Sequence, residues 1–169
     1  HSDPATFLLA AGARVRLRGR NGTRELTIDE LVVGPLETAR AEDELLAAVV
    51  VPAPARGEGR GYEKAKFRER PAVSVGVSVR VVKGAIADAT VSVGSMVDFP
   101  MLVPGAAAAL AGAPADPASG AFNEALARAR THFEPLEAIG DLDGSPDYKR
   151  HLAGVMLGRA ARAALSEAA

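Results

Sequence analysis

The sequence predicts an α+β fold in which a three-stranded antiparallel sheet packs against a bundle of helices. Valine recurs at every second position from Val73 to Val81, as in a strand with one buried face. A Lys83-Gly84 turn then leads into a second alternating segment over residues 87–93. The rest of the chain is rich in alanine and carries capping signals typical of helices. Helices must therefore cover the apolar face of the sheet.

Composition narrows the classes of function. The 169 residues have a formal net charge of −1, 4% aromatic residues and no cysteine. Near-neutral charge and few rings argue against a nucleic-acid partner. Without cysteine this chain holds no disulfide, no thiolate zinc site and no iron–sulfur cluster, and a cytoplasmic location is expected. No apolar run approaches the roughly 18 residues of a membrane-spanning helix.

The first residues predict a β-hairpin. Residues 13–19 alternate between apolar and arginine side chains, Asn21-Gly22 supplies a tight turn, and residues 23–26 return as the second strand. The simplest interpretation of the arginines is a solvated strand face that protects a sheet edge. Docking of an acidic partner on this face stays open as an alternative.

A short helix, a strand and a linker are predicted next. Thr27 and Glu30 have the spacing of a capping box, which predicts a helical turn over residues 28–32. Residues 45–51 are almost continuously apolar and predict a buried strand. The Pro- and Gly-rich segment 52–61 predicts a flexible linker and the best domain boundary.

The C-terminal part predicts a strand over residues 62–67, as the first of the three strands, and then helices. A short helix covers 104–110, and Asp116-Pro117 predicts an N-cap followed by proline at the first helical position. Ser145-Pro146-Asp147 repeats this pattern for the last helix. The side chains expected to face the core are Phe122, Ala125, Leu126, Ala129 and Phe133 on one helix and Tyr148, Leu152, Val155 and Met156 on the other.

The motifs for common catalytic and metal chemistry are missing. The histidines His1, His132 and His151 are far apart and lack metal-ligand spacing, and no serine lies in a nucleophile motif, so we predict neither a metal site nor catalytic residues in this chain. The acidic residues over 134–147 are interpreted as helix caps and a solvated loop. A cation or a partner contact remains an alternative for this acidic loop.

Six short segments of the sequence follow one another in a distinctive order. They are HSDPA at 1–5, VGPLETA at 33–39, ELL at 44–46 running to VP at 51–52, YEK at 62–64, RERPAVSV at 68–75 and GSPDYKRHL at 144–152. Together they resemble the flavoprotein (medium) subunit of molybdenum hydroxylases, of the carbon monoxide dehydrogenase and xanthine dehydrogenase type. The resemblance implies that residues 1–52 are the C-terminal part of an FAD-binding subdomain and that residues 57–169 form the C-terminal domain of the subunit.

The resemblance also implies a role in electron transfer. In this family FAD accepts electrons from [2Fe–2S] clusters on a small subunit, after a substrate is oxidised at a molybdopterin cofactor on a large subunit, and passes them to an external acceptor. The chain would then be an oxidoreductase subunit within a hetero-oligomer. It begins at His1, downstream of the Gly-rich pyrophosphate loops of the family, so we expect a processed or fragmentary chain that alone is inactive and binds FAD weakly or not at all.

Four positions are matched to flavin contacts by this resemblance. Lys64 corresponds to a lysine that reaches the flavin ring, Asp3 to a flavin-contacting acid, and Thr38 and Ala39 to a loop that borders the flavin. The sequence departs from the family over residues 94–100 (GSMVDFP), where relatives usually have a paired-glycine turn and a nearby arginine. It departs again after Asp3, where a short turn with a second aspartate is missing.

Two other hypotheses remain open from the sequence. One is a non-catalytic interaction module that binds a partner protein through its arginine strand and its C-terminal helices. The other is a stand-alone flavin oxidoreductase of the related cell-wall reductase type.

Overall fold

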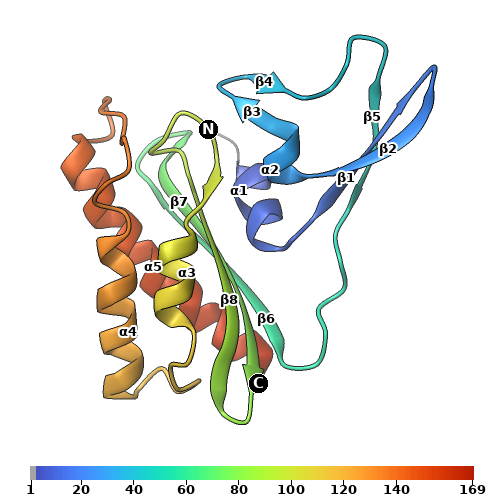
Figure 1. The fold of residues 1–169 in the computed structure, drawn as a ribbon. Helices are drawn as coiled ribbons and strands as arrows, with labels where there is room; N and C mark the ends of the chain where they lie inside the picture. Colours follow the sequence, from blue (N-terminus) through green and yellow to red (C-terminus); the bar gives the residue numbers. More distant parts are fainter. Residues whose placement is uncertain (1–2) are drawn as a thin grey trace.

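The computed structural model describes residues 3–169, so His1 and Ser2 lie outside the described residues. The chain forms two lobes, and the predicted α+β class is confirmed (Figure 1). The N-terminal lobe contains α1 (Asp3–Ala10), β1 (Arg14–Gly19), β2 (Gly22–Thr27), α2 (Ile28–Leu31), β3 (Val32–Gly34), β4 (Glu37–Thr38) and β5 (Leu45–Val50). The C-terminal lobe contains β6 (Glu58–Lys66), β7 (Pro71–Val82), β8 (Ala85–Gly94), β9 (Met101–Leu102), α3 (Pro104–Leu110), α4 (Gly120–Thr131) and α5 (Pro146–Ala168).

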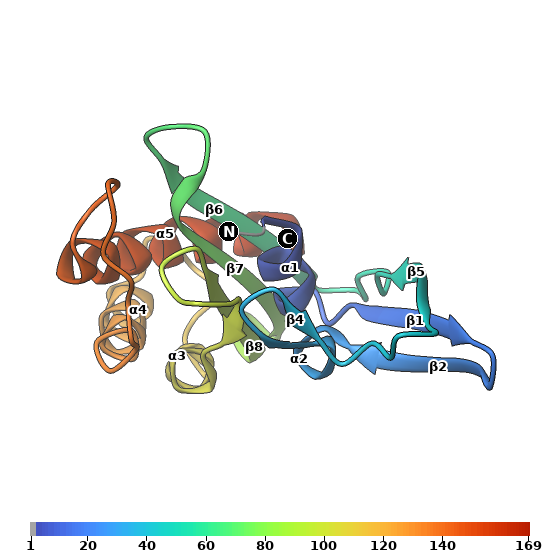
Figure 2. The same ribbon diagram turned by 90° about the horizontal axis from the view of Figure 1, so that it is seen from above.

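The C-terminal sheet is antiparallel in the order β6-β7-β8-β9. The alternating valines of β7 are buried, as predicted, and form one core with α3, α4 and α5. The three predicted strands are present, and the two-residue strand β9 extends the sheet beyond them. Viewed from above, α1 lies on the face of the sheet opposite the helical layer (Figure 2).

The last four residues of the predicted linker, 58–61, belong to a strand, which corrects the prediction there. β6 begins at Glu58, and Gly59 and Gly61 face α5. A Cβ added to Gly61 would lie 2.8 Å from the carbonyl carbon of Ala160 and closer still to its oxygen, and Gly59 meets Ala164 in the same way. Gly59 and Gly61 are therefore required where the backbones of β6 and α5 meet.

The N-terminal lobe contains the predicted hairpin and capping box. Strands β1 and β2 pair antiparallel, and the hydroxyl of Thr27 and the carboxylate of Glu30 cap α2 reciprocally. The arginines at 14 and 16 both form ion pairs with Glu25 on β2.

The prediction of a buried strand over 45–51 is wrong. β5 pairs with one side of β1 at the edge of the sheet, and its apolar side chains are largely exposed. A continuous apolar run does not specify which face is covered, because burial depends on elements from elsewhere in the fold.

Two details of the predicted helices differ from the structure. α4 begins at Gly120, because Asp116 accepts a hydrogen bond from the Ala118 amide within a turn and does not cap the helix. In α5, Tyr148 is half exposed while its neighbour Lys149 is completely buried. Ser145 caps α5 as expected. None of the helices between residues 3 and 169 combines the length and apolar character needed to span a membrane.

Candidate functional site

The predicted site residues Asp3 and Lys64 meet at the junction of the two lobes. Lys64 Nζ donates a short hydrogen bond to Asp3 Oδ2, and the hydroxyl of Tyr62 donates to Oδ1 at 2.8 Å. The ring of Tyr62 in turn packs edge-on against Phe7, with ring centroids 6.3 Å apart. Asp3 and Lys64 remain about one-third exposed. The first turn of α1 and the edge strand β6 thus form one polar cluster that solvent or a ligand can reach.

The charges of this cluster are set by its hydrogen bonds. Burial alone would raise the pKa of Asp3, but the hydrogen bonds from Lys64 and Tyr62 and the charge of Lys64 outweigh this and lower it. Burial, and then the hydrogen bond to Asp3, raise the pKa of Tyr62. At neutral pH Asp3 is therefore a carboxylate, and Tyr62 keeps the proton that it donates.

Small residues on two strands determine where α1 lies. Ser92 Oγ donates to the Thr6 carbonyl at 2.7 Å, and Thr6 Oγ1 lies 3.2 Å from Ser74 Oγ. A Cβ on Gly76 would lie 2.8 Å from Ala10 Cβ, and a Cβ on Gly94 would overlap the Thr6 hydroxyl. The serines and glycines between the valines form the surface against which α1 packs. This packing brings Asp3 next to Lys64.

Thr38 and Ala39 lie in a different place. Thr38 pairs with Val32 in the β3–β4 hairpin, and both backbone groups of Ala39 are used, its amide by Leu31 and its carbonyl by Arg24. Among residues 3–169 no hydrogen bond or ion pair joins these two residues to Asp3 or Lys64. The structure therefore brings together one pair of the predicted site residues and places the other pair elsewhere.

A hollow of about 380 Å³ lies beside Thr38. The β3–β4 hairpin forms one wall, the loop from Ser95 to Pro100 a second, and Ile139 and Asp141 a third. The amide of Ile139 donates to the Met96 carbonyl at 2.8 Å, which ties the last two walls together.

A buried ion pair supports the third wall. Lys149 Nζ lies 2.7 Å from Asp141 Oδ2, and its side chain is completely buried while that of Asp141 is one-third exposed. The close contact with Lys149 lowers the pKa of Asp141. Asp141 Oδ1 also accepts from the amide of Asp143, and Arg68 lies 3.8 Å from the Asp143 carboxylate. Sequence reasoning missed Lys149, because its position beside Tyr148 on a helix does not reveal which side chain turns inward.

Ser95 stores backbone strain at the edge of this hollow. It has a φ of 67°, is almost completely buried, and its hydroxyl has no hydrogen-bond partner among the described residues. Left-handed backbone and a buried unpaired hydroxyl each cost about 1 kcal/mol or more. We expect Ser95→Gly to raise the free energy of unfolding by about 1 kcal/mol, after the entropic penalty of glycine. Urea denaturation measures this change.

The matched variant for this prediction is Ser95→Ala. It removes the unpaired hydroxyl but keeps a Cβ in the left-handed region, so its gain in stability should be smaller than that of Ser95→Gly. Equal or lower stability of Ser95→Gly relative to the wild type would contradict the prediction.

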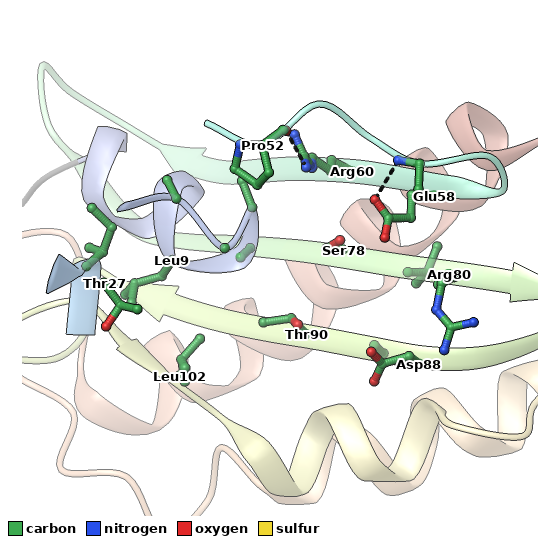
Figure 3. A pocket seen from close by; sticks show the side chains of 18 of the residues that line it. Leu9, Thr27, Pro52, Glu58, Arg60, Ser78, Arg80, Asp88, Thr90 and Leu102 are labelled. Atoms are coloured by element: carbon green, nitrogen blue, oxygen red, sulfur yellow. Dashed lines mark hydrogen bonds between the residues drawn. The ribbon is translucent and has the colours of Figure 1, made fainter. Parts of the chain in front are cut away.

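The outer face of the C-terminal sheet carries another groove, of about 480 Å³. Figure 3 shows Arg60, Ser78 and Thr90 along it, and Arg60 donates to the Pro52 carbonyl at 2.8 Å. Glu58 accepts from the Ala55 amide, so both side chains hold the inter-lobe segment in place. None of the four predicted site residues lines this groove. Within the described residues no three histidine, aspartate or glutamate side chains gather to hold a metal ion.

Comparison with known proteins assigns the chain to a family. Residues 62–164 match the family model for the CO dehydrogenase flavoprotein C-terminal domain, which is more than half of the chain. The chain belongs to this flavoprotein family. Residues 1–54 match a second family model, the FAD-binding domain in molybdopterin dehydrogenase.

Individual relatives agree with the family. The chain is 28% identical to the nicotine 6-hydroxylase medium subunit of Paenarthrobacter nicotinovorans, over 94% of this chain and 56% of that protein. It is also 28% identical to the carbon monoxide dehydrogenase medium chain of Afipia carboxidovorans, over 99% of this chain and 57% of that protein. The chain thus spans slightly more than half the length of these relatives.

Solved structures share the fold. A carbon monoxide dehydrogenase chain from Hydrogenophaga pseudoflava superposes with a TM-score of 0.89 at 29% identity, over 99% of this chain and 57% of that chain. Quinoline 2-oxidoreductase from Pseudomonas putida 86 superposes with a TM-score of 0.84 at 20% identity and supports the fold alone.

The cluster at the lobe junction connects the two matched segments of this flavoprotein-family chain. Asp3 lies in the segment that matches the FAD-binding domain, and Lys64 and Tyr62 lie in the segment that matches the C-terminal domain. The sequence indicated Asp3 and Lys64 separately but did not indicate Tyr62 as their partner. The role of Tyr62 could have been inferred from the alternation of side chains along β6, since residues 62 and 64 share one face of the strand.

Proposed function

We propose that this chain is part of the FAD-carrying medium subunit of a molybdenum-containing hydroxylase, in the complete form of which FAD receives electrons from [2Fe–2S] clusters and passes them to an external acceptor. The observation that carries the proposal is the Asp3–Tyr62–Lys64 cluster, which joins the two family segments. The named relatives support this hypothesis and neither of the two alternatives.

The hydrogen-bond donors and the positive charge of the cluster are suited to binding one edge of a flavin ring. Lys64 has three N–H donors, and only one is used by Asp3, so its partly exposed ammonium can still donate to a ligand. FAD supplies the redox chemistry, and the protein holds the ring and adjusts its electronics. A preorganised cation stabilises negative charge that develops next to it. Asp3 orients this cation, and Tyr62 keeps Asp3 in place.

Thr38 and Ala39 border the flavin in this proposal, and the domain boundaries are 1–52 and 57–169. The complete enzyme contains a molybdopterin-binding large subunit and an iron–sulfur small subunit, and it is cytoplasmic. Copurification of both subunits with the complete flavoprotein, followed by cell fractionation, tests these points. Flavin titration of the complete subunit tests the central claim, and failure to bind FAD would refute it.

Lys64→Ala in the complete subunit is expected to weaken FAD binding about tenfold or to lower its midpoint potential by about 30 mV. For a two-electron couple this potential change corresponds to about 1.4 kcal/mol. The physical reason is the loss of a cation next to the reduced ring. Flavin titration and spectroelectrochemistry measure the two effects.

Lys66→Ala is the control, because it removes the same charge from the same strand and leaves the hydrogen bond to Asp3 intact. It should change affinity and potential much less than Lys64→Ala does. Unchanged binding together with an unchanged potential in Lys64→Ala would count against the role of Lys64.

A further inference from the structure

A buried hydroxyl lies between α1 and the cluster at the lobe junction. Ser74 on β7 is completely buried and pairs with Lys64 on β6, so the two residues lie side by side in the sheet. Its Oγ lies 3.2 Å from Thr6 Oγ1 on α1. Figure 2 shows α1 on this face of the sheet, opposite the helical layer. Ser74 therefore lies where α1, β6 and β7 meet.

Ser74 also interacts with Tyr62. Burial and the hydrogen bond to Asp3 raise the pKa of Tyr62, whereas a hydrogen bond with Ser74 lowers it. A partner that lowers the pKa of a phenol stabilises its anionic form, so Ser74 is the donor in this contact. A serine hydroxyl has a single proton to donate. Ser74 can therefore only accept from Thr6, which makes the Thr6 hydroxyl the donor in the other contact.

Donation runs in one direction through these groups. Thr6 donates to Ser74, Ser74 donates to Tyr62, and Tyr62 donates to the carboxylate of Asp3. We call the hydroxyl groups of Thr6, Ser74 and Tyr62 the hydroxyl chain. Hydrogen bonds in series polarise one another, and the last bond is strengthened by the charge of its acceptor. The hydroxyl chain thus fixes Tyr62 from its buried side while Asp3 stays in contact with Lys64.

We propose that Ser74 is a positioning residue of the flavin site, which holds the hydroxyl of Tyr62 on Asp3 and so orients the ammonium of Lys64 toward the ring. This inference rests on the proposed function. Ser74 is completely buried and does not itself reach a ligand, so it acts through Tyr62 and then Asp3. The alternative is a purely structural role, in which Ser74 only packs against α1.

Flavin titration of the complete subunit tests this proposal with Ser74→Ala and Tyr62→Phe. Ser74→Ala should weaken FAD binding about fivefold, which is the usual effect of one lost hydrogen bond. It should also lower the midpoint potential, as Lys64→Ala does. In the Tyr62→Phe background Ser74→Ala should have almost no further effect, because Ser74 acts on Asp3 only through the Tyr62 hydroxyl. Additive losses of affinity would contradict the inference.

Ser92→Ala is the matched control. Ser92 is also completely buried beneath α1 and donates to the Thr6 carbonyl, but among residues 3–169 it has no hydrogen bond to Tyr62. Both serine variants remove one hydroxyl from the contact with α1 and should lower the melting temperature to a similar extent. Ser74→Ala alone should change FAD affinity. An equal loss of affinity in Ser92→Ala would mean that the position of α1 is decisive, and it would overturn the inference.

A measurement without FAD separates this inference from the proposed function. NMR titration of the Asp3 carboxyl carbon in the FAD-free complete subunit gives the pKa of Asp3, which is lowered in the wild type. Ser74→Ala should raise this pKa toward its ordinary value, because the hydrogen bonds that favour the carboxylate become weaker, and Ser92→Ala should not. An unchanged pKa in Ser74→Ala would overturn the role of Ser74. Failure of the wild type to bind FAD would refute the proposed function, and the pKa of Asp3 would still decide whether Ser74 positions the cluster.

Discussion

Gly61→Ala is expected to lower the free energy of unfolding by at least about 3 kcal/mol, which is at the upper end of the range for overpacked cores. The added methyl group would overlap the backbone carbonyl of Ala160 in α5. A backbone group cannot rotate away as a side chain can, so strand β6 and the long helix would have to separate. Because the valine core lies between this helix and the sheet, the strain would affect the whole C-terminal lobe.

Gly120→Ala is the control for this prediction. A Cβ at Gly120 meets nothing within 4 Å, and the residue lies at the start of α4. Its effect on stability should stay within about 0.5 kcal/mol. Urea denaturation followed by circular dichroism measures both variants. Equal stability of Gly61→Ala and the wild type would show that α5 can move away from β6.

Asp141→Asn is also expected to have a large effect and to lower the free energy of unfolding by about 3 kcal/mol. The substitution leaves the completely buried ammonium of Lys149 without a counter-charge. Lys149→Met should be clearly less destabilising, because the remaining carboxylate of Asp141 is one-third exposed and water can solvate it. The double variant should be more stable than Asp141→Asn alone, since it contains no buried charge.

The same ion pair predicts a dependence on pH. The pKa of Asp141 is lowered in the folded state, so the pair contributes stability above the ordinary aspartate pKa of about 4 and loses it as the pH falls further. Asp141→Asn should therefore lose less stability than the wild type between neutral and acidic pH. Denaturation curves at several pH values measure this difference. If Lys149→Met proves as destabilising as Asp141→Asn, the packing of Lys149 matters more than its charge.

Local patterns predicted the elements whose signals lie within a few residues. Alternating valines indicated β7, the spacing of Thr27 and Glu30 indicated the cap of α2, and Ser145-Pro146 indicated the start of α5. These predictions are correct because side-chain alternation, helix capping and the fixed φ of proline depend only on residues that are close in the sequence. The cap predicted at Asp116 failed, because the aspartate is used in a turn of its own.

The burial of apolar runs was not predictable in the same way. Residues 45–51 are as apolar as a core strand, yet β5 lies at an exposed edge. Residues 58–61 were predicted as part of a flexible linker, because glycine serves both loops and close backbone packing. In each case the deciding partner is distant in the sequence.

The α+β class, most of the helix and strand positions and the family resemblance that pointed to Asp3 and Lys64 could all be inferred from the amino-acid sequence. The contact between these two side chains, with Tyr62 as a third member, and the burial of Lys149 against Asp141 became evident only in the folded structure. Hydrogen bonds and ion pairs between elements depend on close packing across long sequence separations, which local patterns do not encode. Here the small residues Gly76 and Gly94 bring α1 and its aspartate to the sheet.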